Sequence, residues 1–213
     1  VAEDVTYSGT IAGAIEGTVS GTMDLRANVL DAEGEARFSQ DWTIGSGDTQ
    51  ITIKAGDGSQ LRASVEQSVL TRVSGSVPFE CNLAIGTQQV ALSGNVEGDY
   101  DAQAHSLSGT ASATLTQPVS LESGGNSLTV LPESTARLAL TNNNLSSINF
   151  DLRGEAVVTA AAIQGDAKLN LRVADASYTP DGGLSGQGTA SLAHDVTIVA
   201  PQSQVTLVLK EGG

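Results

Sequence analysis

The sequence predicts an all-β protein built from antiparallel sheets, and three observations lead to this prediction. Apolar and polar residues alternate with a period of two over long stretches, which gives a strand one dry and one wet face. Glycine supplies 24 of the 213 residues, whereas aromatic residues make up only 3%. Related blocks recur, so we expect a sandwich, barrel or β-jellyroll-like arrangement made of about 2.7 copies of a ~77-residue β repeat.

The alternation is clearest between Val5 and Leu25, where odd positions are aliphatic or glycine, apart from Tyr7, and most even positions are Thr, Ser or acidic. A helix would mix the two sets on every side, so the pattern predicts strands. The same period returns over residues 69–85, 148–158 and 167–173. Residues 156–162 are rich in alanine, but their β-branched residues favour a strand there as well.

The repeat is most visible at Trp42, Val119 and Val196, which are 77 residues apart. Each lies in a four-residue block, and a second block with the pattern apolar-Thr-apolar follows six residues later. These second blocks are Ile51–Ile53, Leu128–Val130 and Val205–Leu207. The spacing divides the chain into a partial repeat (1–55), a full repeat (56–132) and a full repeat with a C-terminal strand (133–213), forming one continuous β structure.

The N-terminal stretch is predicted to be an assembly strand. Between Val5 and Val19 it carries one charge, Glu16, and no proline, although exposed strand edges normally carry protective charges or prolines. The residues expected to form this strand are Val5, Tyr7, Gly9, Ile11, Gly13 and Ile15. The alternative interpretation is that the stretch pairs with the chain's own C-terminal strand, Val205–Leu209.

The composition excludes several classes of partner. A net charge of −14 repels phosphate groups, so no nucleic acid is expected to bind. No apolar run reaches the length of a spanning helix, so no transmembrane segment is expected. The sequence begins with Val1 like a processed chain, and it is poor in lysine and aromatic residues. These features indicate an exported bacterial protein of the extracellular space, cell surface or periplasm.

No catalytic, cofactor-binding or metal-binding residues are predicted. His105, expected in a loop, and His194, expected in a strand, do not form a zinc or copper set with the single Cys81. Cys81 is expected to be a buried small hydrophobe. The acidic loops at 45–48 and 56–58 have the composition of turns, although such carboxylates can also bind calcium. We therefore expect a protein that is not an enzyme and that needs no cofactor.

The remaining features predict an exported structural or interaction protein, such as a filament subunit. The incomplete first repeat and the weakly charged N-terminal strand indicate assembly by β-strand pairing. The expected partner is a further copy of the chain or another envelope protein, within an envelope or extracellular assembly.

The alternative function is transport of an apolar ligand. The stretches Tyr100–Gln103, Leu107–Gly109, Leu115–Gln117 and Gly124–Thr129 resemble the periplasmic lipopolysaccharide-bridge family. That family folds as an open β-jellyroll whose dry interior conducts acyl chains, so the resemblance implies a periplasmic carrier that binds lipid between dry sheet faces. The glycines at 9, 13, 17 and 21 are expected to let a second sheet or an acyl chain approach closely. These glycines and the 77-residue period depart from the family, whose interior side chains are large.

Overall fold

The prediction of an all-β protein with antiparallel sheets is confirmed. A computed structural model describes residues 2–11, 15–46, 49–56, 58–85, 88–200 and 205–212, and each regular element in these ranges is a β-strand with antiparallel neighbours. No helix in these ranges is long and apolar enough to span a membrane.

The strands vary from short hairpin arms to long central strands. They are β1 (Ala2–Ile11), β2 (Ile15–Asp24), β3 (Val29–Phe38), β4 (Trp42–Ser46), β5 (Thr49–Ile53), β6 (Gln60–Glu66), β7 (Val69–Ile85), β8 (Gln88–Asp101), β9 (Ser106–Leu115), β10 (Val119–Ser123), β11 (Asn126–Val130), β12 (Thr135–Thr141), β13 (Asn144–Val158), β14 (Ala167–Thr179), β15 (Gly183–Leu192), β16 (Val196–Ala200) and β17 (Val205–Leu209).

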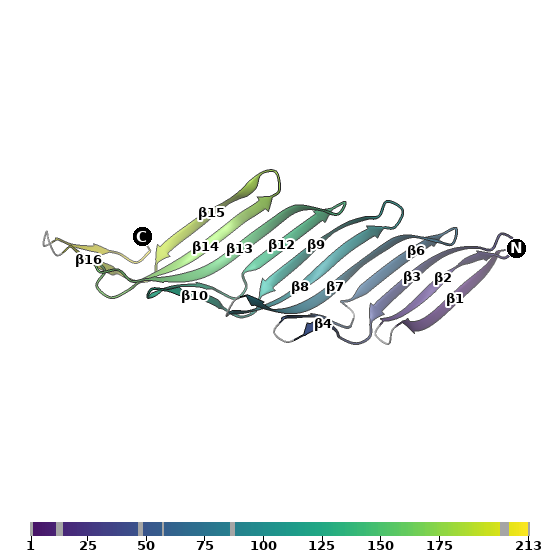
Figure 1. The fold of residues 1–213 in the computed structure, drawn as a ribbon, viewed down its shortest axis with the longest axis horizontal. Coiled ribbons are helices and arrows are strands. Elements are labelled where there is room, and N and C mark those ends of the chain that lie inside the picture. The colour runs from purple at the N-terminus through teal and green to yellow at the C-terminus, as the bar shows by residue number, and fades with distance from the viewer. Residues whose placement is uncertain are drawn as a thin grey trace.

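Most strands follow one another side by side in a single large sheet (Figure 1). In the described residues this sheet has 15 strands, and its main path runs β1-β2-β3-β6-β7-β8-β9-β12-β13-β14-β15. The hairpin β16–β17 forms a separate two-stranded sheet beside its end. The N-terminal strand and the C-terminal hairpin therefore lie at opposite ends of the molecule.

The sheet branches at the two longest strands. On one side of β7, the first half pairs with β6 and the second half pairs with β5. In the same way β13 pairs with β12 and then with β11. The arms β4–β5 and β10–β11 are thus hairpins that extend the lower half of the sheet.

The three recurring sequence blocks all form β-hairpins, but the third hairpin has a different register. Trp42 lies opposite Ile53 and Val119 opposite Val130, in agreement with the spacing of 77. The same spacing predicts Leu207 opposite Val196, whereas the structure places Leu209 there. Two more residues separate the arms of this hairpin, so the equivalents of Ile51 and Ile53 are Leu207 and Leu209.

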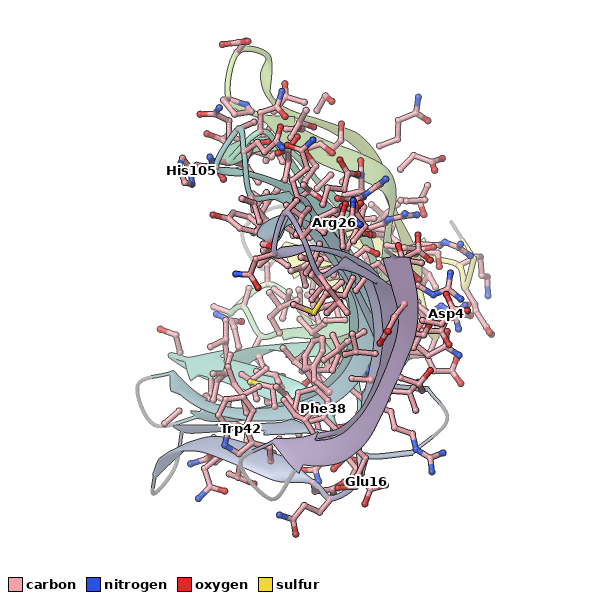
Figure 2. The ribbon with its side chains drawn as sticks, turned by 90° about the vertical axis from the view of Figure 1, so that its right-hand side faces the viewer. Asp4, Glu16, Arg26, Phe38, Trp42 and His105 are labelled. Carbon is pink, nitrogen blue, oxygen red and sulfur yellow. The ribbon has the colours of Figure 1, made fainter. Side chains whose placement is uncertain are left out.

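The main sheet stays open and does not form a closed barrel in the described chain, and the sandwich that we expected is not confirmed. Throughout the described chain β1 pairs only with β2 and β15 only with β14, so the sheet does not close. The principal backbone contacts join neighbours in the sheet, together with β8 and β10. Viewed along the long axis, the sheet has a C-shaped section (Figure 2). Alternation defines a dry face but not what covers it, so the sequence could not distinguish these architectures.

The predicted N-terminal strand is divided into two. Its residues form the hairpin β1–β2, in which Tyr7 lies opposite Val19 and Ile11 opposite Ile15. Within the described residues the alternative pairing with β17 does not occur: β1 pairs with β2 in the large sheet, and β17 pairs with β16 in the separate hairpin. Alternation cannot reveal this division, because it continues in phase from one strand to the next.

Candidate binding surface

The inner side of the curved sheet carries most of the aliphatic side chains, and we call it the concave face. Phe38 and Trp42 lie inside the curve and Asp4 lies outside it (Figure 2). The register places glycine and apolar residues opposite one another on this side across the sheet, as with Val19 and Gly34 or Val96 and Ala111. From β2 to β15, the strand positions on the concave face include no charged residue in the described chain.

Many of these aliphatic side chains remain in contact with solvent. Val96 is 44% exposed, Leu121 59% and Leu184 75%. The other large apolar residues exposed on this face of the sheet are Val19, Trp42, Ile51, Leu107, Leu128 and Tyr178. Among described residues the buried apolar side chains are few and mostly small: Ala32, Phe38, Cys81, Leu115, Ala167, Ala176 and Val196. The concave face is consequently an apolar surface that protein covers only in part.

Some glycines on the concave face lie very close to neighbouring strands. A Cβ at Gly17 would lie 2.8 Å from the Cβ of Ala36, and one at Gly94 would lie 2.9 Å from the Phe79 ring. Both would also press on carbonyl oxygens of adjacent strands. At Gly17 and Gly94 these close neighbours belong to adjacent strands of the same sheet. Glycine therefore allows the sheet to curl tightly toward its apolar side.

Trp42 lies in the exposed part of the concave face. Its ring stacks on Phe38, with centroids 6.1 Å apart and planes at 21°, and the residue is 49% exposed. The matching positions in the other hairpins are Val119 and Val196. Because Trp42 is the sole tryptophan of the chain, it reports on what binds near this surface.

The cysteine and histidines take no part in a common site. Cys81 is buried, and burial raises the pKa of its thiol, which makes it a poor nucleophile. His105 lies in the turn after β8, as expected, with Nδ1 3.4 Å from the Tyr100 hydroxyl. His194 was predicted in a strand but lies in the bend between β15 and β16. In the parts of the chain that are described, no three His, Cys, Asp or Glu residues gather as a metal site.

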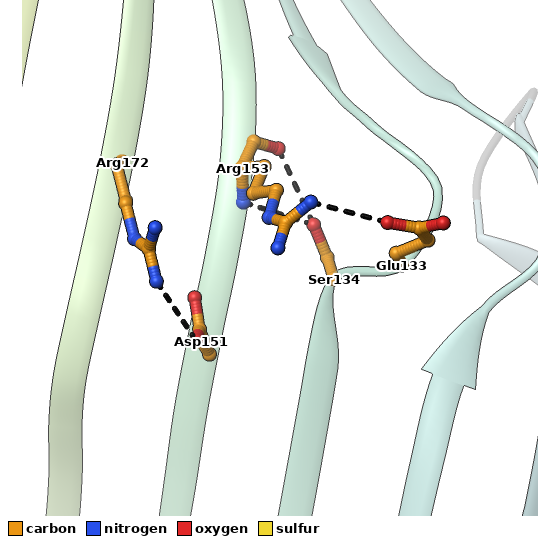
Figure 3. A network of polar contacts seen from close by, with 5 residues as sticks. All are labelled: Glu133, Ser134, Asp151, Arg153 and Arg172. Carbon is orange, nitrogen blue, oxygen red and sulfur yellow. Dashed lines mark hydrogen bonds and ion pairs between the residues drawn. The ribbon is translucent and has the colours of Figure 1, made fainter.

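Two buried serines hold the branch points of the sheet, and sequence reasoning missed both. Ser59 precedes β6, and its Oγ accepts a hydrogen bond from the Phe38 amide at 3.0 Å. Ser134 precedes β12, where its Oγ accepts from the Arg153 amide at 3.0 Å and donates to the Arg153 carbonyl at 3.3 Å (Figure 3). Their position just before a strand was the only available signal, and serine is common in such turns.

Charged side chains occupy the convex face, where they pair across strands. Arg153 lies 3.1 Å from Glu133 and Arg172 lies 3.5 Å from Asp151 (Figure 3). Arg72 pairs with Asp99, and this guanidinium lowers the pKa of the Asp99 carboxyl. The pairs are largely exposed, so each stabilises the fold only slightly.

An aspartate fixes the base of two of the hairpins. Asp41 binds Lys54 at 2.5 Å and accepts the Ala55 amide at 2.8 Å; these two interactions, the amide foremost, lower the pKa of Asp41. Asp195 binds Lys210 at 2.6 Å and accepts the Glu211 amide at 3.0 Å. Its pKa is lowered first by Lys210 and then by that amide. We call each arrangement an aspartate clamp.

The predicted assembly residues are separated by the structure. Val5, Tyr7, Gly9 and Ile11 belong to β1, at one edge of the sheet, and Ile15 begins β2. Gly13 lies outside the described residues, as do Gly47, Asp48 and Asp57 of the two acidic loops.

Comparison of the chain with protein-family models, curated proteins and solved structures gave no match.

Proposed function

We propose that this protein is an exported bacterial binding protein that holds the acyl chains of lipids on its concave face. The observation that carries the proposal is an apolar sheet face with no charged strand position from β2 to β15 in the described chain and with large aliphatic side chains exposed to solvent. Exposed contiguous apolar surfaces of this kind mark sites of interaction.

The large solvent-accessible surface area of the chain supports the proposal. The chain exposes 13552 Å², whereas a compact monomer of 21.6 kDa exposes about 9,200 Å². The excess follows from a single curved layer whose inner face remains open. Covering that face with hydrocarbon would contribute roughly 25 cal/mol for each Å² of apolar surface removed from water.

The shape of the face favours flexible chains over a flat partner. A second flat sheet would touch the rims of a concave surface and leave its centre empty, while acyl chains adapt to the curvature. The lining is mostly aliphatic, so it offers few hydrogen-bonding groups to the backbone of a partner protein. The charged groups stay on the convex side, where they keep the complex hydrated.

A brominated lipid tests this proposal through Trp42. We would titrate the protein with a lysophosphatidylcholine brominated in the middle of its acyl chain, below the concentration at which it forms micelles. The expected result is quenching of Trp42 emission by the brominated lipid and a blue shift without quenching by its unbrominated analogue. Glycerophosphocholine, which has no acyl chain, should change nothing. Unchanged emission with both lipids would overturn the proposal.

Two matched variants locate the binding surface. Val96→Asp places a charge on the concave face of β8, so quenching should need at least tenfold more lipid. Gln89→Asp places the same charge on the convex face of β8 and should bind like the unmodified protein. Equal loss of binding in both variants would contradict a concave-face site.

A second candidate function, assembly by strand pairing, is supported by the open sheet edges. The outer edge of β1 and the free side of β17 lack partners in the described chain. Because β1 contains only Glu3 and Asp4 as charged residues, its edge has little protection against another strand. Assembly and lipid binding are compatible, since they use different surfaces.

A further inference from the structure

The chain contains the same strand junction twice. At the first, Ile53 of β5 lies opposite Phe79 and Ile51 opposite Cys81. At the second, β11 pairs in the corresponding way with β13. In both, the amide after the hairpin donates to the long strand: Lys54 to the Pro78 carbonyl at 2.9 Å, and Leu131 to the Arg153 carbonyl at 2.8 Å.

The third hairpin, β16–β17, has the features needed to form the same junction. Its aspartate clamp repeats that of the first hairpin, with Asp195 and Lys210 in the places of Asp41 and Lys54. The Gly212 amide donates to the Leu192 carbonyl at 3.1 Å, as the Gly56 amide does to Phe38 at 3.2 Å, and both glycines have positive φ. Since β17 occupies the position of β5 and β11, its free side is the one that accepts a long strand.

Strand β1 corresponds to the long strand that such a hairpin accepts. Residues of β2 and β8 match at a spacing of 77, so Gly17 corresponds to Gly94. Gly9 lies opposite Gly17, just as Phe79 lies opposite Gly94. By this register, Gly9–Ile11 correspond to Phe79–Cys81, the segment of β7 that receives β5. The outer edge of β1 therefore corresponds to the edge of β7 that pairs with β5. In the described chain this edge of β1 has no partner.

We propose that β17 of one copy pairs antiparallel with β1 of a second copy, Leu209 opposite Gly9, Val208 opposite Thr10 and Leu207 opposite Ile11. The partner is a second copy because β1 and β17 of one chain lie at opposite ends of the molecule. The outer edge of β1 corresponds to the edges of β7 and β13 that pair with hairpins within the chain. This pairing gives the second candidate function its register and does not depend on lipid binding.

A disulfide cross-link tests the register. Two proteins would be made in a Cys81→Ala background, one with Val208→Cys and one with Thr10→Cys, and mixed under mild oxidation. The expected product is a heterodimer that joins positions 208 and 10, identified by mass spectrometry. Only a few residue pairs form the contact, so it is weak and the cross-link is needed to trap it.

Thr6→Cys provides the register control, because residue 6 lies four residues, or about 13 Å, along β1 from residue 10. It should cross-link to Val208→Cys at least tenfold less. Equal cross-linking at 6 and 10, predominance of homodimers, or no cross-link between well-folded variants would overturn the proposal. Circular dichroism of each variant verifies the fold. Bromine quenching of Trp42 is measured on separate, uncross-linked protein, so the two proposals can fail independently.

Discussion

Gly94 and Gly98 lie four residues apart on the same face of β8 but meet different surroundings. A Cβ at Gly94 would contact the Phe79 ring at 2.9 Å and press on the Ser112 carbonyl. A Cβ at Gly98 would meet nothing nearer than 3.7 Å, the distance to a methyl group of Leu107. The sheet is therefore tightly curled at one position and relaxed at the other.

Alanine substitutions at these positions should have opposite effects. Gly94→Ala is expected to lower the free energy of unfolding by about 1–3 kcal/mol through overpacking. Gly98→Ala should leave it unchanged or raise it by up to about 1 kcal/mol, because alanine loses less backbone entropy on folding. Urea unfolding monitored by circular dichroism measures both. Equal effects of the two substitutions would mean that curvature does not require Gly94.

At the scale of elements, each hairpin keeps its place through a few contacts at its base. The first and third hairpins have an aspartate clamp. The second has Pro118 and Leu131 where the first has Asp41 and Lys54, so it has no carboxylate to titrate there. This difference provides an internal control for pH dependence.

The two clamps should open in acid. Because Asp41 and Asp195 have pKa values below their ordinary 3.8, the clamps stabilise their hairpins above that pH. Their contribution is lost as the pH falls through the lowered pKa values. At neutral pH, Asp41→Asn and Asp195→Asn should speed hydrogen exchange at the Ala55 and Glu211 amides, respectively. Below the lowered pKa values, variants and unmodified protein should exchange alike.

Amides of β11 are the reference for this experiment, since their hairpin has no clamp. Exchange there should not respond to either substitution. A response equal to that at Ala55 and Glu211 would show that the substitutions loosen the whole sheet instead of one hairpin.

For the whole molecule, the single layer determines how the fold comes apart. Strands contact their neighbours along the sheet, so stability approximates a sum of neighbour terms, as in repeat proteins. We expect unfolding to begin at the open ends and to proceed inward. Calorimetry should then give an enthalpy larger than the van't Hoff enthalpy. Equality of the two enthalpies would indicate one cooperative unit.

Much of the strand pattern could be predicted from the sequence, and the architecture could not. Period-two alternation identifies strands such as β7 because it depends only on backbone geometry. It leaves open whether a second sheet covers a dry face. The alternation around Val96 is the same whether the Val96 side chain is exposed or buried. The hairpin blocks at Trp42 and Val119 were recognisable, but nothing in the sequence marked the longer connection before Leu209. The aspartate clamps depend on contacts between residues far apart in sequence, which alternation does not encode.

The strands β3, β9 and β15 begin at Val29, Ser106 and Gly183, each 77 residues after the last. Within the described sheet, four strand spacings separate β3 from β9 and again β9 from β15. At about 4.8 Å for each spacing, 77 residues lengthen the sheet by about 19 Å. A gene duplication of one such segment would lengthen the molecule by that fixed step and leave its cross-section unchanged. Evolution could therefore adjust the reach of this protein without redesigning its fold.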